Sequence, residues 1–301
     1  MKQINNIPVE EHFASGHRAC AGCGAALAVR YALKAAGKNT IVANATGCLE
    51  VFSTPYPETS WKVPWIHGAF ENAASIMSGI HRALRTQGRR GKVNLVVFGG
   101  DGGTFDIGFQ FISGAFERGE KFTYICYDNG AYMNTGIQRS GATPKFASTT
   151  TTPSGKKIHG KMEFKKPVPL IFAAHGAYVA TANIAYPHDY IDKVKEALKF
   201  EGPSYIQVYS PCPTGWKHAT NMSIEVAKKA FQTKVTPLYE IKEGVLEFYR
   251  KPSNPKPIDE YLMLQGRFKH MNQKEKKLAQ EHIDNQWSRL EQLEMTKVHL
   301  S

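Results

Sequence analysis

The sequence predicts an α/β protein built on one doubly wound, mostly parallel sheet, with helices on both faces and a C-terminal extension. Short apolar runs rich in β-branched and aromatic residues alternate with segments whose apolar residues recur at helical spacing. That alternation is typical of a parallel sheet covered by helices. The chain has 301 residues, 42% of them hydrophobic, which is enough to bury a large core.

The expected elements follow in chain order. Strands are predicted at residues 40–46, 93–100, 121–128, 177–183 and 203–210. Helices are predicted at 71–86, from about 104 onward, at 190–200 and at 272–294. The last helix is charged but carries an apolar line through Ile283, Trp287 and Leu290, which suits packing on its own domain or on a partner subunit. We expect a main domain over 1–220, with a core that continues to about 240, and a helical extension over 241–301.

Composition excludes several classes of protein. The net charge of +12 is compatible with nucleic acid, acidic protein partners or anionic small ligands, but no nucleic-acid-binding motif accompanies it, so we expect no nucleic acid partner. Five cysteines without a signal-like apolar stretch near the start argue against a secreted disulfide framework and for a reducing, cytoplasmic compartment. No window approaches the roughly 18 apolar residues of a membrane span.

A glycine-rich loop after the second predicted strand is the first candidate for a binding site. The strand ends in Gly99, Gly100, Asp101, Gly102 and Gly103, and a helical segment follows. Glycines allow close backbone approach, and the amide groups at the start of a helix attract anions, which together suit a diphosphate. An acidic residue in such a loop would repel phosphate unless a cation lay between them. Asp101 is therefore a candidate Mg²⁺ ligand.

The next predicted strand ends in a second polar loop. Asp128, Asn129 and Gly130 close the run "FTYICYD", and Asn129 comes 28 positions after Asp101, a suitable distance for strand, helix and strand. Gly-Asp-Gly and Asp-Asn-Gly are also common turn sequences, and each alone would indicate no more than a turn. Their pairing at this spacing, each after a buried strand, favours a shared ion.

These two loops resemble the thiamine diphosphate motif, and other segments narrow the resemblance. "YMNTGIQRSGATP" (132–144), "GHRACAGCG", "NATGC" and "SPCPTGW" are similar to β subunits of 2-oxoacid:ferredoxin oxidoreductases, above all the pyruvate:ferredoxin oxidoreductases. The resemblance spans about residues 12–220. It implies Mg²⁺ held by Asp101, Asn129 and the carbonyl of Ala131. It further implies a thiamine diphosphate site that includes Gly47, Gly100, Asp101, Gly102, Asn129, Ala131 and Asn134.

The cysteines leave a choice of chemistry. Cys20 and Cys23 could form a zinc knuckle, a dithiol, half of a cluster site or a chance pair, but not a haem attachment, because Gly24 follows Cys23. Cys48 and Cys212 each follow a predicted strand, and four thiolates suit either Zn²⁺ or a [4Fe-4S] cluster. The resemblance implies the cluster, with all four cysteines as ligands.

The fifth cysteine is different. Cys126 lies inside the apolar run "YICYD", where we expect a core thiol.

The resemblance also implies an activity and partners. Relatives decarboxylate a 2-oxoacid, most closely pyruvate here, pass the acyl group to coenzyme A and pass electrons to ferredoxin. No confident candidate for the carboxylate that activates the aminopyrimidine ring is found in this sequence, and family members take it from another subunit. The family's α, γ and δ subunits are the implied partners.

Three further segments carry weaker signals. Asn134 matches a family residue that faces the substrate, although an Asn serving a turn is an alternative. His67 is interpreted as a hydrogen-bonded histidine at a helix entry rather than a site residue. The lysine-rich segment at 145–166 could be a lid, a partner-binding arm or a solvated loop.

Two alternatives to the redox function remain. A non-redox thiamine enzyme could hold structural zinc in the same cysteines, and a basic binding protein would bind polyanions without any cofactor. Within the family, branched-chain, aryl or oxalate-type substrates share the same sequence framework.

Overall fold

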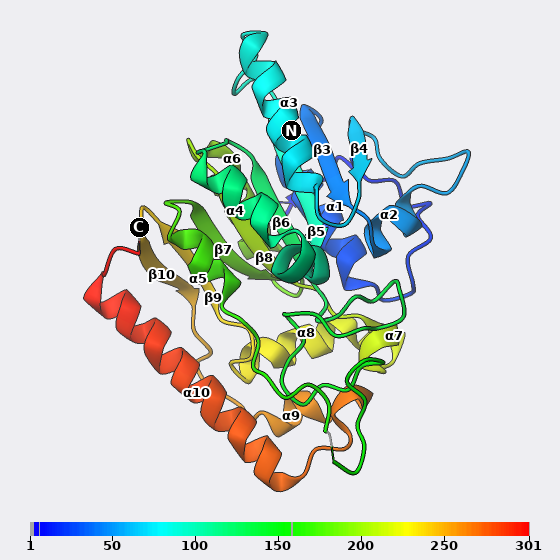
Figure 1. The fold of residues 1–301 in the computed structure, drawn as a ribbon, viewed down its shortest axis with the longest axis vertical. Coiled ribbons are helices and arrows are strands. Elements are labelled where there is room, and N and C mark those ends of the chain that lie inside the picture. Colours follow the sequence, from blue (N-terminus) through cyan, green and yellow to red (C-terminus); the bar gives the residue numbers. More distant parts are fainter. Residues whose placement is uncertain (1–2, 6, 158, 301) are drawn as a thin grey trace.

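The computed structural model describes all residues except 1–2, 6, 158 and 301. Its centre is an eight-stranded sheet with the order β10-β9-β7-β8-β6-β5-β3-β4 (Figure 1). The strands are β3 (Thr40–Ala45), β4 (Trp65–Gly68), β5 (Asn94–Gly100), β6 (Thr123–Asp128), β7 (Tyr178–Asn183), β8 (Ser204–Tyr209), β9 (Leu238–Lys242) and β10 (Val245–Arg250). The strands from β7 to β4 run parallel, and β9 and β10 join antiparallel at one edge. A small separate hairpin pairs β1 (Gln3–Ile4) with β2 (Ile7–Pro8).

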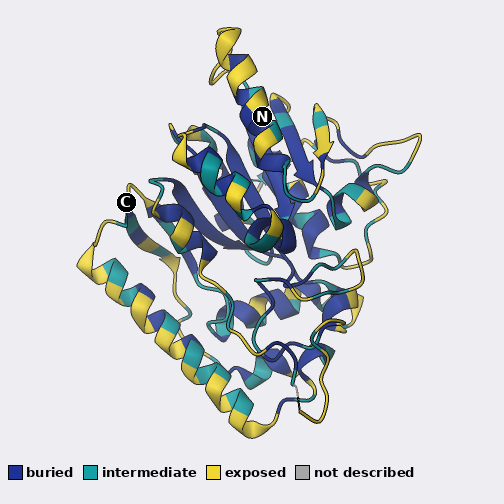
Figure 2. Cartoon of the chain, in the orientation of Figure 1, coloured by how far each residue is buried: buried dark blue, intermediate teal, exposed yellow. Residues whose placement is uncertain are grey.

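Helices cover both faces of the sheet. The α-helices of the described chain are α1 (Gly24–Ala36), α2 (Cys48–Ser53), α3 (Ala73–Thr86), α4 (Phe109–Glu117), α5 (Val168–Ala173), α6 (Pro187–Lys199), α7 (Pro213–Trp216), α8 (Ser223–Gln232), α9 (Asp259–Leu262) and α10 (Gln273–Thr296), and not all of them lie on the sheet. Because successive strand residues point to opposite faces, Val96 and Phe98 of β5 pack in one cluster with residues of α1, α6 and α8. Leu95 and Val97 pack in a second cluster with α3, α4 and α5. Figure 2 shows the strands buried between these layers, which confirms the predicted fold class.

All five predicted strands are present, with bounds shifted by a residue or two. The predicted helix from about residue 104 begins as a π-helical turn, η1 (Gly103–Ile107), which leads into α4. β4, β9 and β10 were not predicted. β4 is a four-residue edge strand, while β9 and β10 form a hairpin whose charged residues hide the apolar pattern.

The C-terminal part of the chain continues the same sheet. β10 pairs with β9, so the sheet extends to Arg250, beyond the core limit of about 240 that the sequence suggests. The predicted final helix is α10, and Asn272 caps it in a reciprocal pair of hydrogen bonds with Glu275. Its apolar line, Ile283, Trp287 and Leu290, is buried against the two core clusters. The division of the chain into a main domain and an extension remains a proposal.

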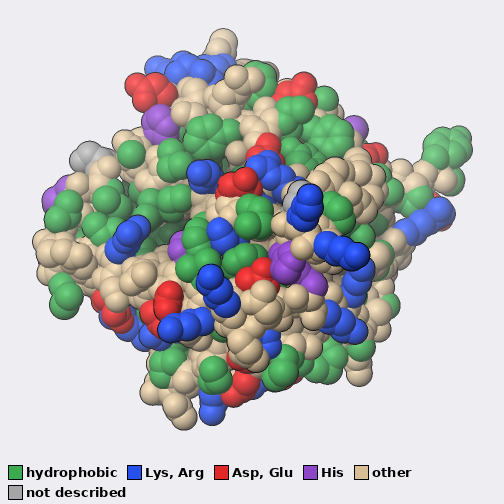
Figure 3. Space-filling view, turned by 60° about the horizontal axis from the view of Figure 1, so that its bottom comes forward, with side chains coloured by type: hydrophobic (Ala, Val, Ile, Leu, Met, Phe, Trp, Pro, Cys, Tyr) green, Lys and Arg blue, Asp and Glu red, His purple; other side chains and the backbone are tan. Residues whose placement is uncertain are grey.

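The long segment between β6 and α5 has little regular structure, as expected. Its described residues form only isolated bridges, such as Ser154 with His159. Its lysines differ from one another: Lys161 is buried, Lys165 pairs with Asp128, and Lys156 is exposed. The lower end of the molecule, turned forward in Figure 3, presents Lys, Arg and His side chains among hydrophobic ones. No helix in the described part of the chain is long and apolar enough to cross a membrane.

Candidate active site

The predicted loops meet at the carboxyl ends of the parallel strands. A shallow hollow of about 30 Å³ there is lined by Thr46, Gly47, Cys48, Phe70, Gly100, Gly102, Gly103, Tyr127, Asn129, Ala131, Tyr132, Met133, Asn134 and Thr135. Residues from the ends of β3, β5 and β6, far apart in sequence, therefore share one site. This edge is where open parallel sheets bind ligands.

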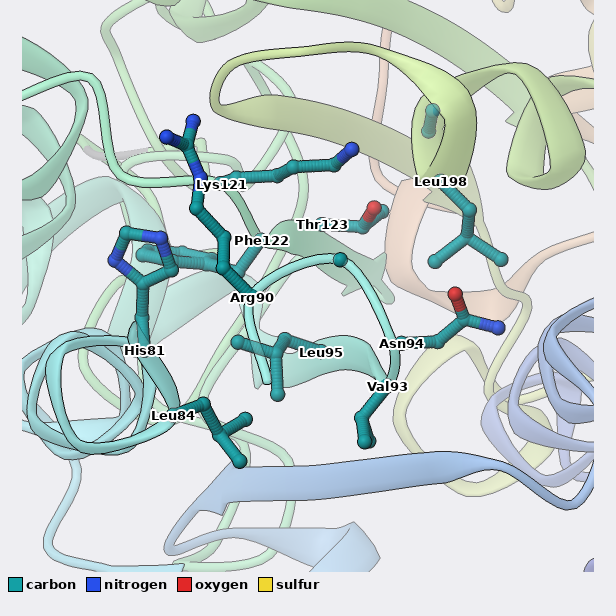
Figure 4. A pocket seen from close by; sticks show the side chains of 12 residues that line it. His81, Leu84, Arg90, Val93, Asn94, Leu95, Lys121, Phe122, Thr123 and Leu198 are labelled. Atoms are coloured by element: carbon teal, nitrogen blue, oxygen red, sulfur yellow. The ribbon is translucent and has the colours of Figure 1, made fainter. Parts of the chain in front are cut away.

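Other cavities lie elsewhere, among them one of about 600 Å³ lined by residues of β9 and β10 together with Lys297 and His299. The one in Figure 4, about 40 Å³, is at the opposite edge of the sheet, between His81, Arg90 and the starts of β5 and β6, and has room for only a few water molecules. A cavity of about 360 Å³ lies between α10 and the ends of β7 and β8, and Lys165 and Arg289 are among the side chains lining it. None of these cavities includes any of the site residues predicted from sequence.

Three oxygen-bearing groups converge beside the hollow. The side-chain amide of Asn129 ends 2.9 Å from the carbonyl oxygen of Ala131 and 3.0 Å from Oδ1 of Asp101. With nitrogen at that end the amide donates to both oxygens, and with oxygen there three oxygens face one another. Ligands about 2.1 Å from an octahedral Mg²⁺ ion are roughly 3 Å apart. The observed spacing therefore fits one bound Mg²⁺ as well as it fits a hydrogen-bonded amide.

Asp101 is buried at the centre of this arrangement. Burial, and next the charge of Asp128, raise its pKa to about 7, although hydrogen bonds from the Ser140 hydroxyl and from the backbone N–H of Asn129 favour the ionised form. The Asp128 carboxylate is held by Lys165, by Gln207 Nε2 at 2.8 Å and by the Gly130 amide at 3.1 Å. A cation at Asp101 would relieve the cost of burying its negative charge.

The glycines allow close approach around the hollow. A Cβ at Gly102 would lie 2.2 Å from the ring of Tyr132, whose hydroxyl donates to the Gly102 carbonyl at 3.0 Å. Gly102 precedes η1, and no side chain caps the first turn. The start of a helical segment favours anions, and here it lies beside the oxygens of Asp101, Asn129 and Ala131, an arrangement that suits a diphosphate group with a bound cation.

Four cysteines lie near one another on the same edge. The Gly24 amide donates to the Pro211 carbonyl at 3.0 Å, which ties the turn carrying Cys20 and Cys23 to the segment carrying Cys212. Burial raises the pKa of Cys23 to about 11 and that of Cys48 to about 12, and the charges of the other cysteines contribute. Burial also raises the pKa of Cys212.

These cysteines do not form a closed metal site. Within the described ranges, no three or more His, Cys, Asp or Glu side chains are close enough to hold a metal ion together. The cysteines are free, and Cys20 is exposed. Cys126, by contrast, is fully buried among core residues, as predicted.

Comparison with known proteins points to the same kind of binding site. Residues 45–208, more than half of the chain, match the family described as "Thiamine pyrophosphate enzyme, C-terminal TPP binding domain". The pyruvate synthase subunit PorB of Methanothermobacter marburgensis is 55% identical over 280 residues, which cover 93% of this chain and 97% of that protein. The chain belongs to the 2-oxoacid:ferredoxin oxidoreductase family, as a PorB-type subunit.

Other relatives of this PorB-type chain differ in their named substrates. The ketoisovalerate oxidoreductase subunit VorB of Pyrococcus furiosus is 46% identical over 300 residues, 97% of this chain and 96% of that protein. Among solved structures, a 2-oxoglutarate:ferredoxin oxidoreductase from Magnetococcus marinus matches with a TM-score of 0.57 at 24% identity, over 75% of this chain and 82% of that one. That likeness supports the fold.

Two side chains at the rim differ in their surroundings. Asn134 of the PorB-type chain is exposed and lines the hollow. His67 lies in β4 and pairs through Nε2 with the Thr46 hydroxyl at 2.7 Å, so its expected place at a helix entry is wrong.

The sequence did not predict the residues that hydrogen-bond to the candidate metal ligands and their loop. Ser140 and Thr143 reach Asp101 and the Gly130 carbonyl from a turn far along the chain. The only signal was their place within the motif "SGATP".

Proposed function

We propose that this chain binds thiamine diphosphate through Mg²⁺ and serves as the cofactor-carrying subunit of a pyruvate:ferredoxin oxidoreductase. The enzyme would convert pyruvate and coenzyme A to acetyl-CoA and CO2, reversibly, and pass two electrons singly to ferredoxin. The convergence of Asp101, Asn129 and the Ala131 carbonyl at ligand spacing carries the proposal. Identity is higher to the PorB of Methanothermobacter marburgensis, at 55%, than to the VorB of Pyrococcus furiosus, at 46%, and this supports pyruvate over the substrate named for VorB.

Each group in the hollow has a role under this proposal. Asp101, Asn129 and the Ala131 carbonyl would hold Mg²⁺, and Gly100, Gly102 and the amides of η1 would face the diphosphate. Gly47, where the backbone has a φ of +154°, would allow the cofactor close to the end of β3. When bound, thiamine diphosphate supplies a carbanion that attacks the 2-oxo carbon and a thiazolium ring that accepts the electrons of decarboxylation.

Asn134 is proposed as the catalytic residue of this chain. Its exposed amide, at the rim of the hollow, would donate a hydrogen bond to the bound oxoacid or to the oxyanion that develops on it.

Cys20, Cys23, Cys48 and Cys212 are proposed ligands of one [4Fe-4S] cluster. The link between Gly24 and Pro211 supports this by holding the two cysteine segments together. Because the pKa values of Cys23, Cys48 and Cys212 are raised, these thiols are protonated at neutral pH, and cluster assembly must release those protons.

The chain contributes only part of the proposed site. Pockets that enclose a ligand of this size usually measure several hundred Å³ or more, whereas the hollow measures about 30 Å³. Other subunits, of the α, γ and δ types, would close it and supply the carboxylate that activates the cofactor. Coenzyme A, ferredoxin and the 2-oxoacid are the proposed substrates.

Composition and activity of the complex test the proposal. We would purify the chain without oxygen together with the subunits that accompany it, and measure thiamine diphosphate, Mg²⁺, iron, zinc and acid-labile sulfide. We expect one cofactor per site, about four iron and four sulfide per chain, and coenzyme A-dependent reduction of a low-potential acceptor with pyruvate. Asp101→Asn should lose the bound cofactor.

Three other results would change the proposed function. Absence of thiamine diphosphate would overturn the cofactor site. Zinc in place of iron would indicate a non-redox thiamine enzyme, and a preference for 2-oxoisovalerate would place the chain with VorB.

A further inference from the structure

Lys161 is a buried cation in the long segment between β6 and α5. It is 2% exposed. Its Nζ donates to three carbonyl oxygens, those of Ser140 at 3.2 Å, Gly141 at 2.9 Å and Thr143 at 2.8 Å. An ammonium group has three donors, so this one turn uses all of them.

The turn that Lys161 holds, residues 140–143, reaches the proposed metal site at two points. The Ser140 hydroxyl donates to Oδ2 of Asp101, and the Thr143 hydroxyl donates to the Gly130 carbonyl at 2.7 Å. Gly130 lies between Asn129 and Ala131. Both segments that would ligate Mg²⁺ therefore rest on the same turn.

A third contact joins the turn to the helical segment after the glycine-rich loop. The Gly141 amide donates to both carboxylate oxygens of Asp106, at 3.1 and 3.0 Å. Asp106 lies in η1, whose first residue, Gly103, lines the hollow. The turn is thus linked to the metal ligands and to the proposed diphosphate loop.

We propose that Lys161 is a positioning residue for Mg²⁺ and thiamine diphosphate, acting through the 140–143 turn without touching either. The inference rests on the proposed function, because it concerns the affinity of the same site. Without the ammonium, three carbonyls of a buried turn lose their donors, and the turn relaxes toward water. Ser140 and Thr143 then no longer fix Asp101 and the 129–131 loop at ligand spacing.

The charge of Lys161 gives the proposal a pH signature. Burial, and next the charge of Arg139, lower the pKa of Lys161 to about 8; Lys165 lowers it further, while Glu163 and Asp106 raise it. Above that pH the neutral amine keeps only two donors for three carbonyls. The contribution of Lys161 to cofactor affinity should therefore fall between pH 7 and pH 9.

The test compares Lys161→Met with Lys156→Met, an exposed lysine of the same segment, in the purified complex. After removal of the cofactor, the Kd for thiamine diphosphate is measured at fixed Mg²⁺ by tryptophan fluorescence. Trp216 is a suitable reporter, because its Nε1 donates to the Asn129 carbonyl at 2.6 Å. We expect K161M to raise the Kd at least tenfold, with kcat at saturating cofactor within about threefold of wild type, and K156M to change neither.

The pH profile separates positioning from general stability. Because Asp101 titrates in the same range in both proteins, the quantity compared is the ratio of the K161M Kd to the wild-type Kd, and this ratio should fall from pH 7 to pH 9 as Lys161 loses its charge. Ser140→Ala provides a second variant in case K161M fails to assemble. It removes the link to Asp101 but keeps the carbonyl that Lys161 holds, and it should raise the Kd at least threefold and reduce the pH effect.

Two results would overturn the inference, and they differ from failure of the proposed function. K161M that binds the cofactor as wild type does, or S140A with both an unchanged Kd and an unchanged pH profile, would show that the turn does not position the site. A wild-type complex without Mg²⁺-dependent binding of thiamine diphosphate would overturn the proposed function and, with it, this inference.

Discussion

At the scale of single residues, the site depends on how closely backbone and side chains approach one another. Gly102 shows this most directly, because any side chain there would occupy the space of the Tyr132 ring. Tyr132 in turn lines the hollow and holds the Gly102 carbonyl. The two residues form one wall of the proposed diphosphate site.

We predict that Gly102→Ala weakens cofactor binding more than it weakens the fold. The added methyl group must displace the Tyr132 ring, and we expect a rise in the Kd for thiamine diphosphate of about tenfold or more, which corresponds to about 1.4 kcal/mol. Gly79→Ala is the matched control: Gly79 is exposed in α3 with open space around it, so alanine should stabilise the helix by about 0.5–1 kcal/mol. Equal Kd values for G102A and wild type would mean that the ring position does not matter.

The sequence could identify some residues of the site but not others. Asp101 and Asn129 directly follow adjacent strands, so their spacing along the chain is enough to predict that they meet. Ser140 and Lys161 meet Asp101 only because a long irregular segment folds back on itself. No periodicity encodes such a path, and the burial of Lys161 runs against the usual exposure of lysine.

At the scale of secondary-structure elements, α3 is joined to the start of β6 by a buried carboxylate. Glu120 is 2% exposed and accepts from Arg118 Nε at 3.0 Å, from Arg82 at 3.3 Å and from the Ser78 hydroxyl. Burial raises the pKa of Glu120. The hydrogen bonds and charges of these partners lower it by more than burial raises it, so the net pKa lies below the ordinary value of 4.5. The ionised carboxylate therefore stabilises the packing of α3 and α4.

We predict that Glu120→Gln lowers stability at pH 7 by about 1–3 kcal/mol, because one carboxylate with three donors is replaced by a neutral amide. A carboxylate with a lowered pKa contributes stability that is present above its unfolded pKa and is lost as the pH falls through its folded pKa. The difference between wild type and E120Q should therefore shrink below about pH 4.5. Thermal unfolding midpoints of both proteins across pH 3–7 measure this stability difference. A difference that does not change with pH would contradict the prediction.

The elements that could not be predicted from the sequence lack a clear periodic pattern of apolar residues. β10 is the edge strand and is largely exposed, β9 lies next to it, and charged residues interrupt the apolar run of both. The central strands β6 and β8 are buried on both faces, and their continuous apolar runs were recognised. The π-helical turn at Gly103–Ile107 follows from the local path of the chain after β5, which helical periodicity does not report.

At the scale of the whole molecule, the fold brings all the predicted cofactor residues to one edge but leaves that edge open. The hollow measures about 30 Å³, and Asn134 lies exposed at its rim. Four cysteines lie on the same edge, and Cys20 is exposed. A lone chain would bind the diphosphate end of the cofactor while water reached the rest, and water weakens the electrostatic interactions on which such a site depends.

We therefore predict that the isolated chain binds thiamine diphosphate at least a hundredfold more weakly than the assembled complex and does not reduce a low-potential acceptor with any 2-oxoacid. Mixing it with its separately purified partner subunits should restore both properties together, because the same contacts enclose the cofactor and complete the catalytic groups. The Kd of each form, measured at equal Mg²⁺, and the rate with pyruvate test this. Equal affinity in the two forms would mean that this single chain already encloses the cofactor, and the partners would then be needed only for later steps.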